Sequence, residues 1–178
     1  MIHGWPGSRA LSHGERTYLE ELKQWEQDEG AYGHIQGTRP QALGYGLNDS
    51  PAGLAARIVE KWRAWSDCNG DVETTFTRDQ LLTNITLYWV TETINSSTRI
   101  YYETRKGRWR FGEGERIEVP CAIAVFPREL DRPVREWAER MYNVRRWTEM
   151  PRGGQFAATE EPEMLARGIR EFFRPLRR

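Results

Sequence analysis

Val119-Pro120-Cys121-Ala122-Ile123-Ala124-Val125-Phe126, residues 119–126, is a short apolar run of the kind that forms a buried β-strand. After it the sequence predicts a helix over 133–141, a second strand over 144–150 and a final helix over 162–173. Strands that alternate with helices in this way are typical of a parallel sheet. The last third of the chain therefore predicts an α/β fold.

The preceding part of the chain predicts helices, because helix-start signals stand before apolar residues at helical spacing. The start signals are Ser12 with Glu15 for a helix over 12–29, Ser50 with Pro51 for a second helix, and Thr77 with Gln80 for a third. A short helix is predicted over 97–103. Residues 30–48 hold five glycines and a proline and are predicted to form a loop, and 105–114 are predicted to be irregular.

The composition narrows the classes of function. The 178 residues suggest one domain, and 26 basic and 26 acidic residues cancel, which argues against a general binder of nucleic acid or membrane surfaces. Arg108-Trp109-Arg110 places an aromatic ring between cations, as in binders of single-stranded nucleic acid, but so small a patch favours a solvated loop. Eight Trp and seven Tyr suit either a large aromatic core or a pocket for an apolar ligand.

The two cysteines and the apolar runs indicate a compartment. Cys68 and Cys121 lie far apart without metal-ligand spacing, which favours free thiols in a reducing compartment. The sequence has no run of about 18 apolar residues, so it predicts no transmembrane helix. Met1-Ile2-His3 is not expected to begin a signal peptide. We therefore expect a cytoplasmic protein without a metal site.

Two glycine-bearing motifs and one acid suit hydrolytic chemistry. His3-Gly4-Trp5-Pro6-Gly7-Ser8 is a turn whose backbone N–H groups would face a substrate oxygen, as in an oxyanion hole. Glu129 stands just past the first predicted strand, where an acid could orient a histidine base. In Arg152-Gly153-Gly154-Gln155-Phe156-Ala157-Ala158 the histidine would stand at Gln155, but an amide does not accept a proton near neutral pH.

Four further stretches of the sequence make the chain resemble the microsomal-type epoxide hydrolases of the α/β-hydrolase superfamily. The stretches are 30–40 (Gly-Ala-Tyr-Gly-His-Ile-Gln-Gly-Thr-Arg-Pro), 47–55 (Leu-Asn-Asp-Ser-Pro-Ala-Gly-Leu-Ala), 81–89 (Leu-Leu-Thr-Asn-Ile-Thr-Leu-Tyr-Trp) and 96–103 (Ser-Ser-Thr-Arg-Ile-Tyr-Tyr-Glu). The resemblance runs from about residue 11 to 178. It implies an α/β-hydrolase remnant with a helical cap domain. The expected divisions are an oxyanion-turn remnant at 1–10, the cap at 11–115 and the C-terminal part of the sheet domain at 116–178.

The resemblance also implies a cofactor-free reaction. An aspartate attacks an epoxide carbon to form an ester, and a water activated by a histidine hydrolyses that ester. Two cap tyrosines hold and protonate the epoxide oxygen; by motif they are Tyr32 and Tyr101, with Tyr102 an open alternative to Tyr101. Glu129 would orient the base, and the backbone N–H of Trp5 would be one oxyanion donor. The substrate would be a small apolar or aromatic epoxide.

The chain departs from the family pattern at the nucleophile. Ser8-Arg9-Ala10-Leu11 runs straight from the opening turn into the cap, so the segment that carries the nucleophile turn is missing, as in an internal deletion. Glu92 stands where the family usually has glycine. The remaining aspartates are candidate nucleophiles by residue type only, and each is better explained as a helix cap, a turn residue or a solvated side chain: Asp49, Asp67, Asp71, Asp79 and Asp131.

We therefore expect a member of the family with little or no turnover. The alternatives are a non-catalytic module that binds an apolar ligand or pairs with an intact homologue, and a decayed gene product. An incomplete sheet would leave apolar side chains partly exposed, among them Val119, Ile123, Val125 and Trp147. Each would then lose part of the roughly 1.5–3 kcal/mol by which full burial stabilises a fold. We expect a weakly stable chain that aggregates or forms a homo-oligomer unless a partner covers it.

Overall fold

The structure is a computed structural model and describes residues 11–107, 112, 114–132 and 134–177. Its elements are α1 (His13–Asp28), α2 (Ala31–Thr38), α3 (Pro40–Asp49), α4 (Pro51–Trp65), η1 (Val72–Thr74), α5 (Arg78–Thr91), α6 (Ile94–Lys106), β1 (Ile117–Val125), α7 (Arg135–Met141), β2 (Tyr142–Glu149), α8 (Ala157–Glu160), α9 (Pro162–Phe173) and η2 (Arg174–Leu176). The predicted change from helices to alternating strands and helices is confirmed. The turn at 1–10, with Trp5, and Arg108-Trp109-Arg110 lie outside the described residues.

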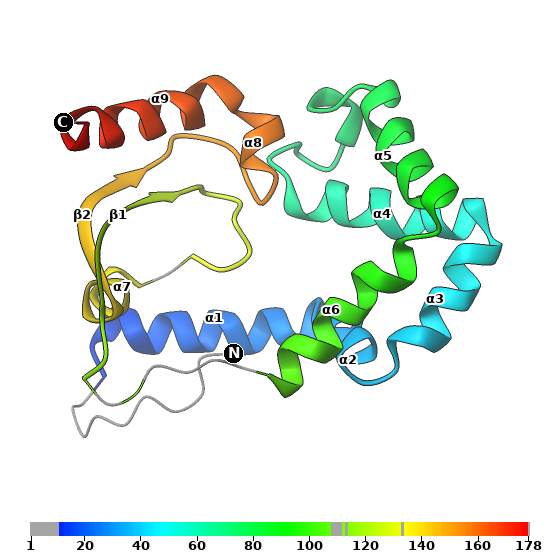
Figure 1. Cartoon of the computed structure of the whole chain (residues 1–178), viewed down its shortest axis with the longest axis horizontal. Helices are drawn as coiled ribbons and strands as arrows, with labels where there is room; N and C mark the ends of the chain where they lie inside the picture. Colours follow the sequence, from blue (N-terminus) through cyan, green and yellow to red (C-terminus); the bar gives the residue numbers. More distant parts are fainter. Residues whose placement is uncertain (1–10, 108–111, 113, 133, 178) are drawn as a thin grey trace.

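The helices α2 to α6 gather at one end of the molecule, and α1 runs from them toward the strands (Figure 1). A buried cluster joins Leu47, Leu54, Ile85 and Ile94, which come from α3, α4, α5 and α6 in turn. Leu54 is completely buried. The main apolar cluster therefore lies inside the helical part and not between that part and the sheet.

The predicted helix starts are confirmed atom by atom. The Ser12 side chain accepts a hydrogen bond from the Glu15 N–H, and the Glu15 carboxylate accepts one from the Ser12 N–H, which completes a capping box. Thr77 and Gln80 form the same box at α5. Ser50 caps α4, and Pro51 occupies its first helical position.

The loop predicted over 30–48 is wrong, because the structure has α2 and α3 there. Two of the glycines that suggested a loop instead allow close packing against α6. A Cβ atom at Gly44 would lie 2.5 Å from Asn95 Oδ1, and one at Gly37 would lie 3.4 Å from Arg105 Cδ. Glycine at these positions therefore serves contacts between helices. Helix α6, which makes these contacts, is longer than the helix predicted over 97–103.

Glu92 follows α5 in a left-handed conformation, with φ +53° and ψ +31°. A residue with a Cβ atom adopts this conformation at a cost of roughly 1–2 kcal/mol, whereas glycine adopts it freely. A glycine at this position, as the resemblance implies for the family, would avoid that cost. Glu92 is exposed, which places its charge on the surface.

The two strands β1 and β2 pair in parallel, as predicted, with Ile123 opposite Trp147 and Val125 opposite Glu149. Helix α7 precedes β2 directly, and α9 lies along the sheet and packs on β1 (Figure 1). In the described part of the chain the sheet has only these two strands. A parallel sheet is normally buried on both faces and paired at its edges.

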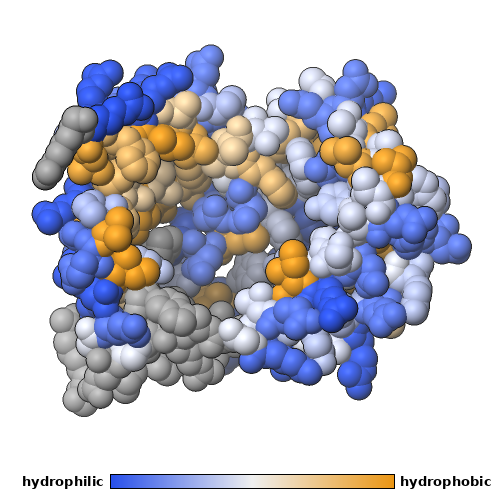
Figure 2. Space-filling model, viewed as in Figure 1, coloured by the Kyte–Doolittle hydropathy of each residue, from blue (hydrophilic) through white to orange (hydrophobic). Residues whose placement is uncertain are grey.

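Apolar surface is exposed around this small sheet, as predicted. Val119 is 69% exposed, and Ile123, Val125 and Trp147 are half-buried. Apolar side chains gather beside α9 and the strands in the upper left of Figure 2. An apolar groove of about 330 Å³ lies between β1 and α9, with Phe172 and other apolar side chains along it.

Candidate functional site

Glu129 lies in the segment that follows β1, where it is half-buried at the boundary with the helical part. The N–H of Leu130 donates a hydrogen bond to Glu129 Oε1 over 2.8 Å. Burial raises the pKa of the Glu129 carboxyl above its ordinary value, and the negative charges of Asp131 and Glu160 add to the rise, while the Leu130 hydrogen bond opposes it. Glu129 is thus an acid held by the backbone in a partly desolvated place.

An isolated parallel bridge stands one residue before Glu129 and one residue before Gln155. Arg128 and Gly154 form a parallel bridge, and the Arg128 N–H donates to the Gly153 carbonyl over 3.0 Å. Glu129 and Gln155 are the next residues on the two sides of that bridge. The Gln155 side chain is exposed, and its N–H donates to the Trp65 carbonyl over 3.0 Å. The backbone of residue 155 therefore lies against the end of α4, and the bridge brings the segment before it to the segment before Glu129.

The two glycines before Gln155 are required by this close approach. Gly153 has φ +102°, and a Cβ atom there would lie 2.8 Å from Phe126 Cδ1. A Cβ atom at Gly154 would lie 2.6 Å from the carbonyl oxygen of Trp65. Side chains at 153 and 154 would force the loop away from β1 and from α4.

The structure also brings Tyr32 of α2 and Tyr101 of α6 together. Their ring centroids lie 5.8 Å apart, nearly perpendicular. Burial raises the pKa of Tyr32 to about 12; Tyr101 adds to the rise through its charge and a hydrogen bond, and Arg57 opposes it. The alternative, Tyr102, is half-buried with Lys106 Nζ 4.3 Å from its ring centroid. Tyr101 rather than Tyr102 therefore contacts Tyr32.

Two tryptophans connect the tyrosines with the segment of Glu129. The Tyr32 ring lies 6.3 Å from Trp25 and 5.1 Å from Trp65, between centroids. Both tryptophans also line a pocket of about 360 Å³ that Glu129 lines from the other side. The pocket is otherwise lined by Tyr18, Glu21, Leu22, Glu29, Ala64, Pro127, Arg128, Leu130 and Arg132. Its lining mixes three aromatic with five charged side chains and includes Glu129, whereas Tyr32, Tyr101 and Gln155 do not line it.

Sequence reasoning missed one polar contact at this pocket. The Tyr18 hydroxyl donates a short hydrogen bond to the Asp131 carboxylate, and the Tyr18 ring meets Trp137 edge to face at 5.3 Å. Burial, and then the Asp131 hydrogen bond, raise the pKa of Tyr18 above its ordinary value. No local pattern in the sequence links Tyr18 to Asp131, because the two residues are 113 positions apart.

The candidate aspartates have structural partners or lie at helix ends. Asp131 binds Tyr18, and Asp71 caps η1 by accepting the Glu73 N–H over 3.1 Å. Asp67 accepts a backbone N–H from Gly153 over 3.0 Å. Asp79 lies in the first turn of α5, and Asp49 is the last residue of α3. Of the five, only Asp131 lies between a described strand and the next described helix, in the long segment from β1 to α7 and not on a sharp turn.

Within the described ranges, no three His, Cys, Asp or Glu side chains come together as a potential metal site. No described helix is both long enough and apolar enough to cross a membrane.

No family model matches the chain, but several curated proteins are similar to most of its length. It is 43% identical over 168 residues to a putative epoxide hydrolase of Stigmatella aurantiaca, an alignment that covers 94% of this chain and 38% of that protein. It is 42% identical over 153 residues to epoxide hydrolase 1 of Sus scrofa, covering 81% of this chain and 34% of the relative.

Solved structures match in shape as well. The juvenile hormone epoxide hydrolase of the silkworm Bombyx mori superposes with a TM-score of 0.80 at 29% identity, covering 94% of this chain and 43% of that one. The Aspergillus niger epoxide hydrolase superposes with a TM-score of 0.75 at 28% identity, covering 96% and 42%. The chain thus spans about two fifths of the length of these relatives or less. In sequence and in shape alike, the chain belongs to the epoxide hydrolases of the α/β-hydrolase superfamily.

Proposed function

We propose that this chain binds a small apolar or aromatic epoxide but turns it over slowly or not at all. The observation that supports the proposal is the bridge between Arg128 and Gly154, the residues directly before Glu129 and position 155. The family reaction adds water to an epoxide through an aspartyl ester and gives a vicinal diol. Glu129 is the acid that would orient the base, but Gln155 cannot take a proton from water near neutral pH.

The cap residues suit the binding step of that reaction. A Tyr32 pKa of about 12 keeps its hydroxyl protonated at neutral pH, so that it can donate to an epoxide oxygen. Tyr101, in contact with Tyr32, would be the second donor. Trp25 and Trp65 would contact the apolar group of the ligand. The backbone N–H of Trp5 would be the oxyanion donor.

Binding and turnover are tested separately with styrene oxide as a small aromatic epoxide. We expect saturable quenching of tryptophan fluorescence and no diol above the uncatalysed rate. Gln155→His should also form no diol, because the described chain offers no nucleophile. Diol formation by either protein would contradict the loss of turnover, and a linear, unsaturable fluorescence response would contradict binding.

Matched phenylalanine variants identify the donors. Tyr101→Phe should weaken binding by about five- to tenfold, because a net hydrogen bond contributes about 1 kcal/mol. Tyr102→Phe, which removes the neighbouring hydroxyl from the same helix, should leave binding unchanged. The reverse pattern would assign the donor role to Tyr102.

A second candidate function is pairing with another copy of the chain or with an intact homologue. The exposed Val119 and the groove beside α9 favour it, because an open apolar strand edge promotes association. Light scattering across a dilution series should show association, and a monodisperse monomer that unfolds cooperatively would contradict it. The free thiols of Cys68 and Cys121 support a cytoplasmic setting.

A further inference from the structure

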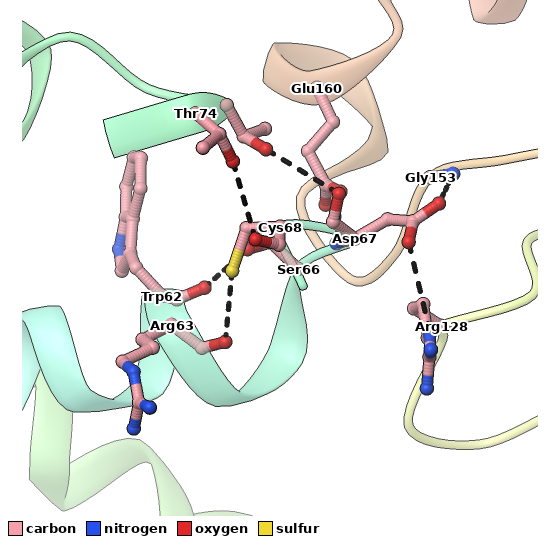
Figure 3. A network of polar contacts seen from close by, with 10 residues as sticks. Trp62, Arg63, Ser66, Asp67, Cys68, Thr74, Arg128, Gly153 and Glu160 are labelled. Atoms are coloured by element: carbon pink, nitrogen blue, oxygen red, sulfur yellow. Dashed lines mark hydrogen bonds and ion pairs between the residues drawn. The ribbon is translucent and has the colours of Figure 1, made fainter. Parts of the chain in front are cut away.

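The turn that follows α4 binds the loop that carries position 155 (Figure 3). Asp67 Oδ2 accepts the Gly153 N–H over 3.0 Å, and the Asp67 N–H donates to Glu160 Oε2 over 2.8 Å. Two residues earlier, the Trp65 carbonyl accepts the Gln155 N–H over 3.0 Å. Three hydrogen bonds therefore connect the cap side with the loop 153–160, and each uses a backbone N–H.

The same contact has an aromatic and a charged component. Glu160 Oε1 accepts the Phe156 N–H over 2.9 Å, so one carboxylate binds both sides of the contact. The Phe156 ring stacks on Trp62 of α4 at 4.8 Å, with an angle of 22° between the planes. Arg128 Nε lies 3.8 Å from Asp67 Oδ1. The residues 153–156 thus contact α4 and the turn after it, Glu160 at the end of α8, and the segment after β1.

None of these contacts uses the side chain of residue 155. Gln155 contributes only its N–H, and Gly153 and Gly154 have no side chain. The loop would therefore keep its position for any side chain at 155. Because Arg128 and Gly154 form a bridge, that position is beside Glu129.

We propose that Asp67 is a positioning residue, which holds the side chain at position 155 beside Glu129 for the step in which the family activates water. The inference rests on the proposed function, in which position 155 is the place of the base. Asp67 acts through the backbone of Gly153 and not on substrate. Its Oδ2 is occupied by that N–H, and its side chain is only 26% exposed, which agrees with a structural role better than with a nucleophile.

The test places a histidine at 155 and measures its protonation. In Gln155→His, NMR titration of the imidazole signals reports the new residue against three native histidines, His3, His13 and His34. The ordinary pKa is about 6.5. A carboxylate within about 4–6 Å should raise it by about one unit. Asp67, Glu160 and Arg128 contact this loop, and Arg152 pairs with Glu161 beside it. Because these groups are charged, as Glu129 is, each variant must separate charge from position.

Two substitutions of Asp67 make that separation. Asp67→Asn removes the charge but keeps an oxygen that accepts the Gly153 N–H, whereas Asp67→Ala removes both. We expect the Asn variant to keep at least half of the upward shift and the Ala variant to lose it. Asp71→Ala removes an acid from the same loop that binds only η1, and it should leave the shift unchanged. Equal shifts in the Asn and Ala variants would overturn the positioning role.

Glu129→Gln distinguishes the failure of this inference from the failure of the proposed site. If Gln155→His shows a raised pKa that Glu129→Gln abolishes, the site stands, whatever Asp67 does. If Glu129→Gln has no effect, the pairing of 129 with 155 is wrong, and the proposed site falls with it.

Amide hydrogen exchange in the unsubstituted chain gives a second test that does not depend on a variant that folds. We expect the N–H groups of Gly153 and Gln155 to exchange as slowly as those in the middle of α4. Exchange at the rate of exposed loops would overturn the proposal.

Discussion

Glu15 is the buried acid whose removal should destabilise the chain most clearly. It is 1% exposed, and its Oε2 accepts the Ser12 N–H over 2.6 Å. Its Oε1 forms an ion pair with the Arg140 guanidinium of α7. One carboxylate therefore fixes the start of α1 and joins α1 to the segment between the strands. We predict that Glu15→Ala lowers the free energy of unfolding by about 2–3 kcal/mol.

The magnitude has two parts. Losing a helix-capping contact costs about 1 kcal/mol. Removing one partner of a fully buried ion pair costs about 3–5 kcal/mol. The second figure is reduced here to about 1–2 kcal/mol, because Arg140 is 34% exposed and its Nε still donates to the Glu136 carbonyl over 3.0 Å. Glu15→Gln keeps the hydrogen bond to Ser12 and should lose only the ion-pair part.

Urea unfolding followed by tryptophan fluorescence measures the effect. With a slope of about 2 kcal/mol per molar urea, Glu15→Ala should lower the midpoint by about 1–1.5 M. Glu20→Ala, in the same helix but exposed, should change stability by less than about 0.5 kcal/mol. A Glu15→Ala shift no larger than that of Glu20→Ala would refute the reasoning and would mean that α1 does not dock through this residue.

Three further effects follow from the backbone and from one tyrosine. Glu92→Gly should raise the unfolding free energy by about 1 kcal/mol in the same urea assay, because it relieves the left-handed strain at φ +53°. Gly153→Ala should lower it by about 2 kcal/mol or more, since the new Cβ atom would meet Phe126 at 2.8 Å at an unfavourable φ; no change would show that the loop moves freely. The raised pKa of Tyr32 should make stability fall between about pH 10 and pH 12, because the unfolded chain releases this proton before the folded chain does; Tyr32→Phe should remove that component from a pH series of unfolding midpoints.

Local signals in the sequence predicted the fold well where they involve near neighbours in the chain. The capping pairs at Ser12 and Thr77 each act over three residues, and both are present in the structure. The apolar run before Phe126 likewise forms β1. Gly44 was misinterpreted because its reason lies in Asn95 on another helix, and the sequence shows a glycine without showing its partner.

The candidate site divides in the same way. Family motifs named Glu129, Gln155, Tyr32 and Tyr101 singly. The structure adds that Tyr32 contacts Tyr101 and that the residues before Glu129 and Gln155 form a bridge. The contact of Asp67 with Gly153 joins residues 86 positions apart, and no pattern near either residue indicates it. Such contacts depend on how the chain returns on itself, which spacing along the sequence does not contain.

The ion pair of Glu15 has a consequence for how the chain is made. Its two residues are 125 positions apart. At about 5–20 residues per second, a ribosome adds Arg140 roughly 6–25 seconds after Glu15. During that interval the first helix of the nascent chain carries an acid whose partner has not yet been made. Helix α1 is therefore synthesised well before α7, so slower translation lengthens the time for which the start of α1 lacks this contact.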